Sequence, residues 1–349
     1  MKLDEYLQIA RSRFSNETKK ILSIYFNGNF DVLKDCLNYK FGDKLASIRD
    51  IKKEINEVKQ NKCHFLTIND SSYPEFLKKI DDAPVVLTFK GNKEILKQNN
   101  VAIVGSRKLE KEDYKIITNA VECINDINSN VVSGLAYGTD ILSHIKSLEY
   151  GTIAVIPCGL CNCYPKEHSF LLDKIVDFNG AVISEFNFNE PAKQNNFIQR
   201  NRIIVGISYA TIIMRARLFK CGSMSSANYA IKFDRSLYTF NFKGENLGNK
   251  YLINKDYAKL VENLSDLKKY LLNDIVNTNF INEKIDCKMK QNNKSLFEIE
   301  KKQDIAKIIK NSGIKPIEGN FYKFFNMCKN ETNIDSKDII IEILMNLNN

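Results

Sequence analysis

The chain has 349 residues, 44% of them hydrophobic and 27% charged, and its formal net charge is +9. This length is too great for one ordinary core and suits two or three domains that are folded almost throughout. No apolar run approaches the ~20 residues that span a bilayer, and residues 1–14 are unlike a signal peptide, so we expect a cytoplasmic protein without a membrane partner.

Residues 1–60 show helical patterns and no strand pattern, because apolar residues recur three and four positions apart. Gly28 and Gly42 are natural breaks between the helical segments. The predicted helices cover 3–13, 17–26, 30–37 and 45–58. We predict a small helical domain here, SAM-like or helix-hairpin-helix-like, without a motif that indicates its role.

From residue 61 onward short β-rich runs alternate with helical segments. The predicted strands cover 64–68, 85–89, 101–104, 130–132, 152–156, 181–183, 210–214 and 236–240. The predicted helices cover 112–127, 139–149, 166–178, 197–206 and 223–233. This alternation predicts an α/β fold over 61–274, an extended Rossmann-like and mostly parallel sheet with helices on both faces. Ligands bind such sheets beyond the carboxyl ends of the strands.

The last part of the chain changes character again. Residues 275–295 are rich in Asn and Lys, which predicts a linker. Helical patterns over 296–349 then predict a small helical or winged-helix-like domain. The Rossmann-like domain is therefore expected to be flanked by small helical domains on both sides.

Arginine is rare and unevenly distributed. Only nine of the 51 basic residues are arginine, and five of these are Arg107, Arg200, Arg202, Arg215 and Arg217. The last four lie in 191–233, which contains no Asp or Glu. The planar guanidinium suits phosphate and base edges, and a stretch without acids predicts a positive surface for a polyanion. For any single arginine, a structural ion pair is the alternative.

Two loops that follow predicted strands carry small residues. In Val-Ala-Ile-Val-Gly-Ser-Arg (101–107), Gly105 lets a phosphate approach the backbone and Arg107 adds a bidentate contact. In Val-Ser-Gly-Leu-Ala-Tyr-Gly-Thr-Asp (132–140), Ser133 and Gly134 leave a concave floor beside the first loop. We assign Asp140 to capping of the following helix.

Two further segments open helices within the acid-free stretch. Lys193-Gln-Asn-Asn-Phe-Ile-Gln-Arg-Asn-Arg202 combines cations and amides with Phe197, which either stacks a base or belongs to the core. Lys220-Cys-Gly-Ser-Met-Ser-Ser226 offers N–H and hydroxyl donors at a helix N-terminus, an arrangement that favours an anion. We predict that all four segments converge on one edge of the sheet.

Several kinds of chemistry lose support from the sequence. The G-x-G-x-x-G fingerprint and the G-x4-G-K-[S/T] loop are absent, so we expect no nucleotide cofactor. No nucleophile–base pair is evident, which favours binding over catalysis. Cys158, Cys161, Cys163 and His168 have a spacing that could supply four zinc ligands. An apolar strand and two prolines explain the same segment, so we expect buried or unreactive thiols and no metal.

These motifs, in this order and spacing, resemble the DNA-processing protein DprA (Smf) family. The resemblance covers about residues 62–272, and the matching pieces are Asp70–Leu77, Val101–Arg107, Val132–Asp140, Pro157–Leu160 with Tyr164-Pro165, Asn196–Ile204, Cys221–Ser223 and Gly248–Ile253. It implies a non-enzymatic protein that binds single-stranded DNA, forms a homodimer and loads RecA onto incoming DNA in natural transformation and recombination. It also implies DNA contacts from Gly105, Ser106, Arg107, Ser133, Gly134, Phe197, Arg200, Asn201, Arg202, Lys220, Gly222 and Ser223.

The chain departs from the family pattern at three positions, Tyr137, Arg215 and Cys161, the last of which replaces the usual aspartate. Tyr137 stands where arginine is usual, which removes a charge but offers a ring that could stack a base. We include Tyr137 among the site residues. We also include Lys193, the first cation of the Lys193–Arg202 segment. Arg215 stands where an acid is common, which motivates the alternative of an interaction adaptor without DNA binding. A further alternative is a nucleotide-binding or nucleotide-cleaving enzyme of the lysine-decarboxylase-like Rossmann group, whose glutamate motif is missing around Cys221.

Overall fold

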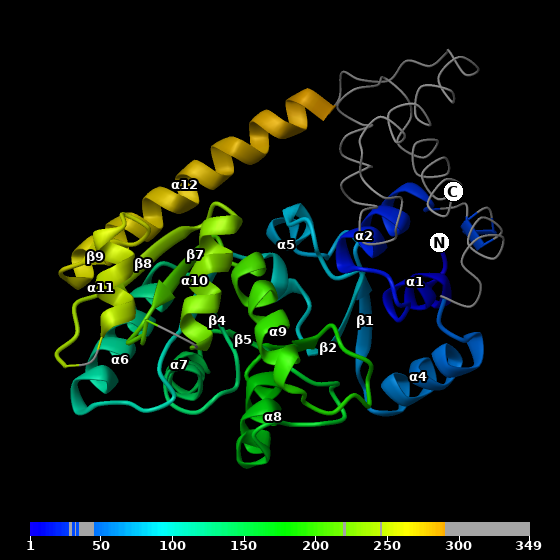
Figure 1. Ribbon diagram of the computed structural model, residues 1–349, viewed down its shortest axis with the longest axis horizontal. Coiled ribbons are helices and arrows are strands. Elements are labelled where there is room, and N and C mark those ends of the chain that lie inside the picture. The colour runs from blue at the N-terminus through cyan, green and yellow to red at the C-terminus, as the bar shows by residue number, and fades with distance from the viewer. Residues whose placement is uncertain (28–29, 32, 35–44, 219–220, 245, 290–349) are drawn as a thin grey trace, which may run out of the picture.

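The computed structural model describes residues 1–289 except 28–29, 32, 35–44, 219–220 and 245. In the described part, one nine-stranded sheet has the order β1-β2-β6-β5-β4-β3-β7-β8-β9 (Figure 1). All neighbours from β6 to β9 are parallel, whereas β1–β2 and β2–β6 are antiparallel. The strands are β1 (His64–Thr67), β2 (Val86–Gly91), β3 (Asn100–Val104), β4 (Asn130–Ser133), β5 (Thr152–Val155), β6 (Ala181–Ser184), β7 (Ala210–Ile213), β8 (Ser236–Phe240) and β9 (Lys259–Val261).

The predicted fold class and mostly parallel sheet are confirmed. Every predicted strand has an observed counterpart, because strands buried on both faces form continuous apolar runs that are visible in a sequence. Strand β9 was missed. It has only three residues and includes the exposed Lys259, so no apolar run indicates it.

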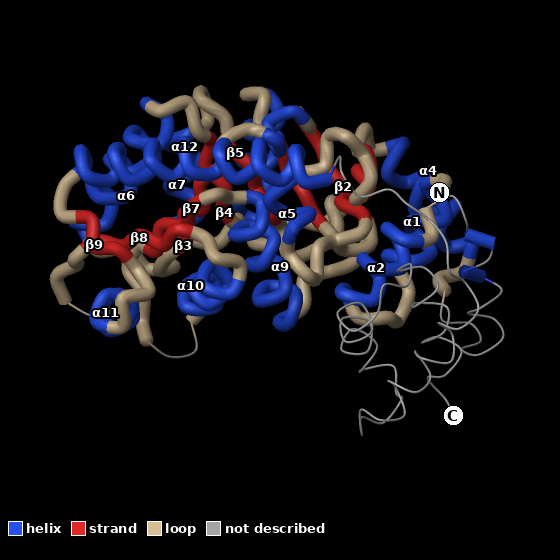
Figure 2. Tube along the Cα trace, turned by 90° about the horizontal axis from the view of Figure 1, so that it is seen from above, coloured by secondary structure: helices blue, strands red, loops and turns tan. Residues whose placement is uncertain are grey.

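Helices cover both faces of the sheet (Figure 2). On one face lie α6 (Lys111–Asp126), α7 (Thr139–Ser147), α8 (Ser169–Asp177) and α12 (Leu264–Met289), and on the other α5 (Glu75–Lys79), α9 (Gln194–Ile207), α10 (Gly222–Lys232) and α11 (Leu247–Asn254). Successive side chains of β3 alternate between the two cores. Val101 and Ile103 pack with the α6 side, and Ala102 and Val104 pack with the α9 side.

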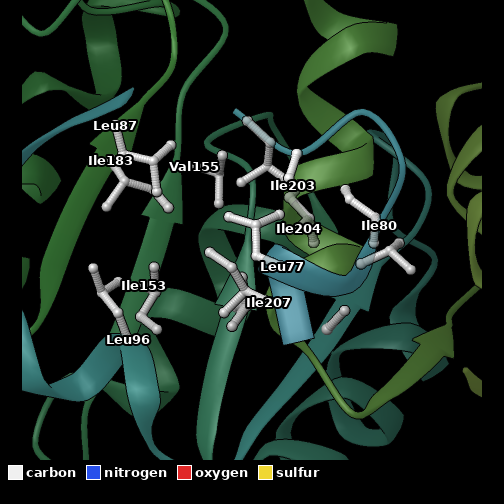
Figure 3. Close-up of a cluster of buried hydrophobic side chains, with 14 of the residues drawn as sticks. Leu77, Ile80, Leu87, Leu96, Ile153, Val155, Ile183, Ile203, Ile204 and Ile207 are labelled. Atoms are coloured by element: carbon white, nitrogen blue, oxygen red, sulfur yellow. The ribbon is translucent and has the colours of Figure 1, made fainter. Parts of the chain in front are cut away.

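Helix α9 is packed tightly between the sheet and α5. Ile203 and Ile204 of α9 lie in one apolar cluster with Val155 of β5 (Figure 3). Leu77 of α5 contacts α9 at Gly206, where an added Cβ would lie 2.7 Å from the Leu77 Cδ1 atom. Because protein cores have little free volume, this packing fixes the rotation of α9 about its axis.

The helices of the first 60 residues lie beside β1 at one end of the sheet (Figure 1). They are α1 (Leu3–Ala10), α2 (Asn16–Tyr25) and α4 (Ile48–Gln60). The Arg11 guanidinium forms a 2.8 Å ion pair with Glu54 and donates a 2.7 Å hydrogen bond to the Glu185 carbonyl oxygen. The Glu54 carboxylate also accepts a 3.0 Å hydrogen bond from the Phe188 amide. These contacts join the N-terminal helices to the loop that follows β6.

The C-terminal part of the chain is described only as far as Met289. Helix α12 is continuous from Leu264 to Met289, so the first part of the predicted linker, 275–289, is helical. Residues 290–295 and the predicted domain over 296–349 lie outside the described residues, as does much of the helix predicted over 30–37. None of the described helices combines the length and apolar character needed to cross a bilayer.

Candidate functional site

The order of the strands reverses at β3. The chain runs from β3 through β4 and β5 to β6, and then returns to place β7 on the other side of β3. Loops that leave two such strands diverge, which opens a crevice at the carboxyl ends. A cavity of about 1130 Å³ lies there, lined by the loop after β3, the start of α6, one side of α9 and the start of α10.

The walls of this cavity carry an excess of positive charge. Its described lining includes eight basic side chains and three acidic ones. We call it the arginine cavity. More than half of the predicted site residues line the arginine cavity, namely Gly105, Ser106, Arg107, Phe197, Arg200, Asn201, Gly222 and Ser223. The lining also includes Lys108, Lys111, Lys115, Asp140 and Lys243, none of which is among the predicted site residues.

The loop after β3 is fastened to the start of α7. The Ser106 carbonyl oxygen accepts 3.1 Å hydrogen bonds from both the amide and the hydroxyl of Thr139. Gly138 has φ +77°, and a Cβ there would lie 2.4 Å from the same carbonyl oxygen. A Cβ at Gly105 would lie 2.5 Å from the Thr139 Oγ1 atom. Gly105 is therefore required by loop-to-loop packing, and the result is a rigid loop that presents the exposed Arg107.

Arg200 forms part of the cavity floor. Its side chain is 4% exposed, and Nη1 donates a 2.8 Å hydrogen bond to the Val155 carbonyl oxygen. A Cβ at Gly134 would lie 1.9 Å from Nη1, so glycine at that position leaves the space that the guanidinium fills. Burial lowers the pKa of Arg200, and the nearby Asp140 carboxylate opposes this. Within the described residues the buried Nε has no hydrogen-bond partner.

Phe197 stands at the rim with another aromatic side chain and an arginine. Its ring is half-buried and lies edge-on to Tyr164, with ring centroids 5.3 Å apart. The Arg107 guanidinium carbon is 5.9 Å from the Phe197 ring centroid. Aromatic rings next to cations are the usual platform for nucleic-acid bases. Tyr164, which is 50% exposed, was not among the predicted site residues, although its motif was noted.

The start of α10 forms another wall of the cavity. The Asn201 Nδ2 atom donates a 3.2 Å hydrogen bond to the Gly222 carbonyl oxygen, which fixes α10 against α9. The residue before the helix, Cys221, makes no side-chain cap, and Gly222 and Ser223 line the cavity. Free N–H groups and the helix dipole favour an anion at this point. Lys220 lies outside the described residues.

Residues 64–272 match the family model of DNA recombination-mediator protein A, which is more than half of the chain. The chain belongs to this family. The predicted resemblance over 62–272 is therefore confirmed.

Two curated relatives show how far the similarity extends. The DNA processing protein DprA of Streptococcus pneumoniae is 35% identical over 206 residues, which cover 58% of this chain and 72% of that protein. The Smf protein of Borreliella burgdorferi is 28% identical over 200 residues, which cover 57% of this chain and 63% of that protein, slightly under two thirds of its length.

Two solved structures share the fold. The X-ray structure of DprA from Streptococcus pneumoniae has a TM-score of 0.64 at 29% identity and covers 76% of this chain and 98% of its own. DNA processing protein A of Helicobacter pylori, solved to explain its single-stranded DNA binding mode, has a TM-score of 0.56 at 28% identity. That match covers 60% of this chain and 97% of the other.

Four other predicted site residues do not line the cavity of this family member. The Ser133 hydroxyl is buried and donates a 2.6 Å hydrogen bond to the Ile103 carbonyl oxygen. Gly134 lies beneath Arg200. The exposed Tyr137 donates to the Glu167 carboxylate at 3.1 Å, and Lys193 forms a 2.9 Å ion pair with a carboxylate three residues before it. Ser133 and Gly134 therefore support the floor of the arginine cavity, whereas Tyr137 and Lys193 lie outside the cavity.

Arg202 is also placed away from the cavity. It is 1% exposed, its Nη2 pairs with the Glu185 carboxylate and its Nη1 donates a 2.6 Å hydrogen bond to the Asp82 carbonyl oxygen. Burial raises the pKa of Glu185, and the guanidinium opposes this increase. A side chain so enclosed has no surface that a phosphate could reach. Arg202 therefore forms a structural ion pair, which was the alternative to a phosphate contact.

Arg215 likewise finds acidic partners, from α6. Its guanidinium pairs with Asp113 at 2.9 Å and with Glu112 at 2.9 Å, and its carbon lies 5.1 Å from the Phe242 ring centroid. The acid-free stretch predicted a positive surface, but Arg215 has acidic partners that lie about a hundred residues earlier in the chain. The charge reversal at 215 is thus matched inside the fold.

The cysteine segment does not assemble a metal centre in the described structure. The thiol of Cys158 donates to the Asn162 carbonyl oxygen, that of Cys163 to the Pro165 carbonyl oxygen, and the His168 Nδ1 atom lies 2.7 Å from the Leu135 carbonyl oxygen. Among the described residues no group of three or more His, Cys, Asp or Glu side chains could hold a metal ion.

Beneath the cavity floor, His144 is buried between two polar groups. Its Nε2 lies 2.6 Å from the Gly134 carbonyl oxygen and its Nδ1 lies 2.6 Å from the Thr152 hydroxyl. A carbonyl only accepts, so Nε2 carries the ring proton. Burial lowers the pKa of His144 from 6.5 to about 4. The ring is therefore neutral under ordinary conditions and holds the strand end on which Arg200 rests.

We predict that Arg202→Met destabilises the protein by about 3 kcal/mol, because it leaves the buried Glu185 and the half-buried Asp82 without their cation. Urea denaturation of the full chain measures the change. Arg49→Ala, at an exposed position on α4, is the control and should stay within about 0.5 kcal/mol of the parent. Equal stability of the two variants would contradict the structural role of Arg202.

We also predict a pH dependence of stability that originates in His144. Because its pKa is depressed in the folded state, the unfolded chain binds the proton first, and stability falls as pH drops from 6.5 toward 4. The loss attributable to His144 is about 2 kcal/mol at about pH 5. His144→Gln, compared with the parent by urea denaturation near pH 7 and near pH 5, should show a smaller loss; parallel behaviour would refute the assignment.

Proposed function

We propose that this protein binds single-stranded DNA in the arginine cavity and does not act as an enzyme. The observation that carries the proposal is Arg200, a buried guanidinium on the floor of a cavity whose described lining has eight basic and three acidic side chains. A buried cation with unused donors is stabilised by an anion from outside the protein. The single-stranded DNA binding of the Helicobacter pylori relative supports the same ligand.

Phosphates and bases would be held by different parts of the site. Arg107 on its rigid loop and the N-terminus of α10 offer donors to phosphates. Phe197 and Tyr164 offer rings on which bases stack. Stacking on a protein ring requires an unpaired base, so the rim favours single strands over duplex.

A binding role also agrees with the residues around the cavity. Its described lining contains no histidine, and His144 and His168 are each bonded to backbone carbonyl oxygens inside the protein. A nucleotide-cleaving enzyme needs an acid or base placed at the reacting bond. Of the three acids in the described lining, Asp140 accepts a hydrogen bond from the Ala136 amide and lies beside Arg200, and Glu112 pairs with Arg215.

We further propose that the DNA held in this way is passed to RecA in natural transformation and recombination, and that the protein acts as a homodimer. Both the transfer of DNA to RecA and the homodimer are proposed because the chain belongs to this family. We also propose the domain division of the sequence analysis, with a helical unit over 1–60, the DNA-binding unit over 61–274, a connecting segment over 275–295 and a small C-terminal domain over 296–349. Contacts of Arg11 and Glu54 with the loop after β6 show that the first two units touch.

The proposal predicts separable effects of charge and ring on DNA affinity. Arg107→Ala should weaken binding of a fluorescent oligo-dT by about tenfold or more and lower the slope of log affinity against log salt by about one. Phe197→Leu should weaken binding by a similar factor without changing that slope, because a ring neutralises no phosphate. Fluorescence anisotropy over a salt series measures both.

The exposed Arg49→Ala is the matched control for loss of one arginine, and it should bind like the parent. Parent affinity in Arg107→Ala, or equal affinity for single strands and duplex, would overturn the assignment. Release of free base from nucleoside monophosphates by the parent protein would favour the enzyme alternative instead.

A further inference from the structure

Cys221 is a half-buried thiol on the wall of the arginine cavity, directly before α10. Its Sγ atom donates a 3.0 Å hydrogen bond to the Arg217 carbonyl oxygen and lies 3.1 Å from the Ser223 hydroxyl oxygen. The other cysteines whose side chains the structure describes do not line this cavity. They are Cys63, Cys123, Cys158, Cys161 and Cys163, of which the first three are buried.

The surroundings of this thiol favour small anions independently of DNA. Arg200, 96% buried, lines the same cavity, and within the described chain only its Nη1 has a hydrogen-bond partner. Arg107 adds a second guanidinium, and the first N–H groups of α10 add positive potential beside the sulfur. A cavity lined by one sign of charge raises the local concentration of ligands with the opposite sign.

We propose that Cys221 is a modification site for small anionic disulfides and that its mixed disulfide closes the cavity to DNA. In the exchange, Cys221 gives its proton to solvent and its sulfur attacks one sulfur of the reagent. A new S–S bond forms, the S–S bond of the reagent breaks, and the second half leaves as a thiolate. The half that remains carries its negative charge into the cavity. Closure to DNA rests on the proposed function, whereas the charge-selective modification does not.

The exposed Cys161 provides an internal comparison. It is more accessible than Cys221 but lies outside the arginine cavity, so exposure alone would make Cys161 the more reactive thiol. Attraction of an anion to the cavity reverses this order for negatively charged reagents only. The charge of the reagent therefore separates the proposed site from an ordinary surface thiol.

The test treats the reduced full chain with DTNB, a disulfide with two carboxylates, or with the neutral dithiodipyridine, and measures labelling of each cysteine by peptide mass spectrometry. The expected result is a preference for DTNB over the neutral reagent that is about tenfold greater at Cys221 than at Cys161 and that shrinks with added salt. Arg107→Ala should reduce this preference. The same preference at both cysteines, or no labelling of Cys221, would overturn the proposal.

A second measurement tests closure with the same protein. Labelled parent protein should lose at least tenfold in oligo-dT affinity and recover it after dithiothreitol. Cys221→Ser should keep its affinity after the same treatment, whereas Cys161→Ser should lose it as the parent does. Undiminished affinity of labelled parent would refute closure. A parent that fails to bind oligo-dT when reduced would refute the proposed DNA function, while the labelling test would still decide whether Cys221 selects anions.

Discussion

The structure depends on how the buried arginines of α9 are neutralised. Arg200 and Arg202 are two residues apart on a helix, so their side chains leave it in nearly opposite directions. Arg202 is enclosed by Asp82 and Glu185 and holds α9 to two loops. Arg200 has the Val155 carbonyl oxygen and a nearby carboxylate, and within the described residues its buried Nε has no hydrogen-bond partner. One helix thus supplies both a structural ion pair and a buried guanidinium on the cavity floor, because its two arginines meet different numbers of acids.

The remaining parts of the site follow from the topology around β3. Helices α9 and α10 come directly before and after β7 in the chain and lie side by side (Figure 1). One continuous piece of chain therefore forms two walls of the cavity. Another wall is the loop after β3, which packs closely against α7 at Gly105. The position of the loop that carries Arg107 is therefore fixed by backbone packing.

The fold could be predicted from the sequence because a parallel sheet buried on both faces produces apolar runs with a regular alternation of helices. The site could be predicted only in part. Arg107, Phe197 and Asn201, which line the cavity, were predicted as site residues because they belong to short motifs that resemble those of the DprA (Smf) family. The role of Arg202 depends on Asp82, 120 residues earlier, and on Glu185, outside the acid-free stretch. No local pattern indicates such a partner, and the same holds for Arg215 and Asp113.

The link between Arg11, Glu54 and the loop after β6 bears on the smallest fragment that can carry this site. The family match begins at residue 64, yet Glu185 in that loop accepts a bond from Arg11 through its carbonyl and holds Arg202 through its carboxylate. A fragment trimmed to the matched residues would lose the guanidinium that orders this loop and would expose β1 along one edge. The boundary of sequence similarity at residue 64 therefore separates the loop after β6 from the Arg11 and Glu54 side chains that contact it.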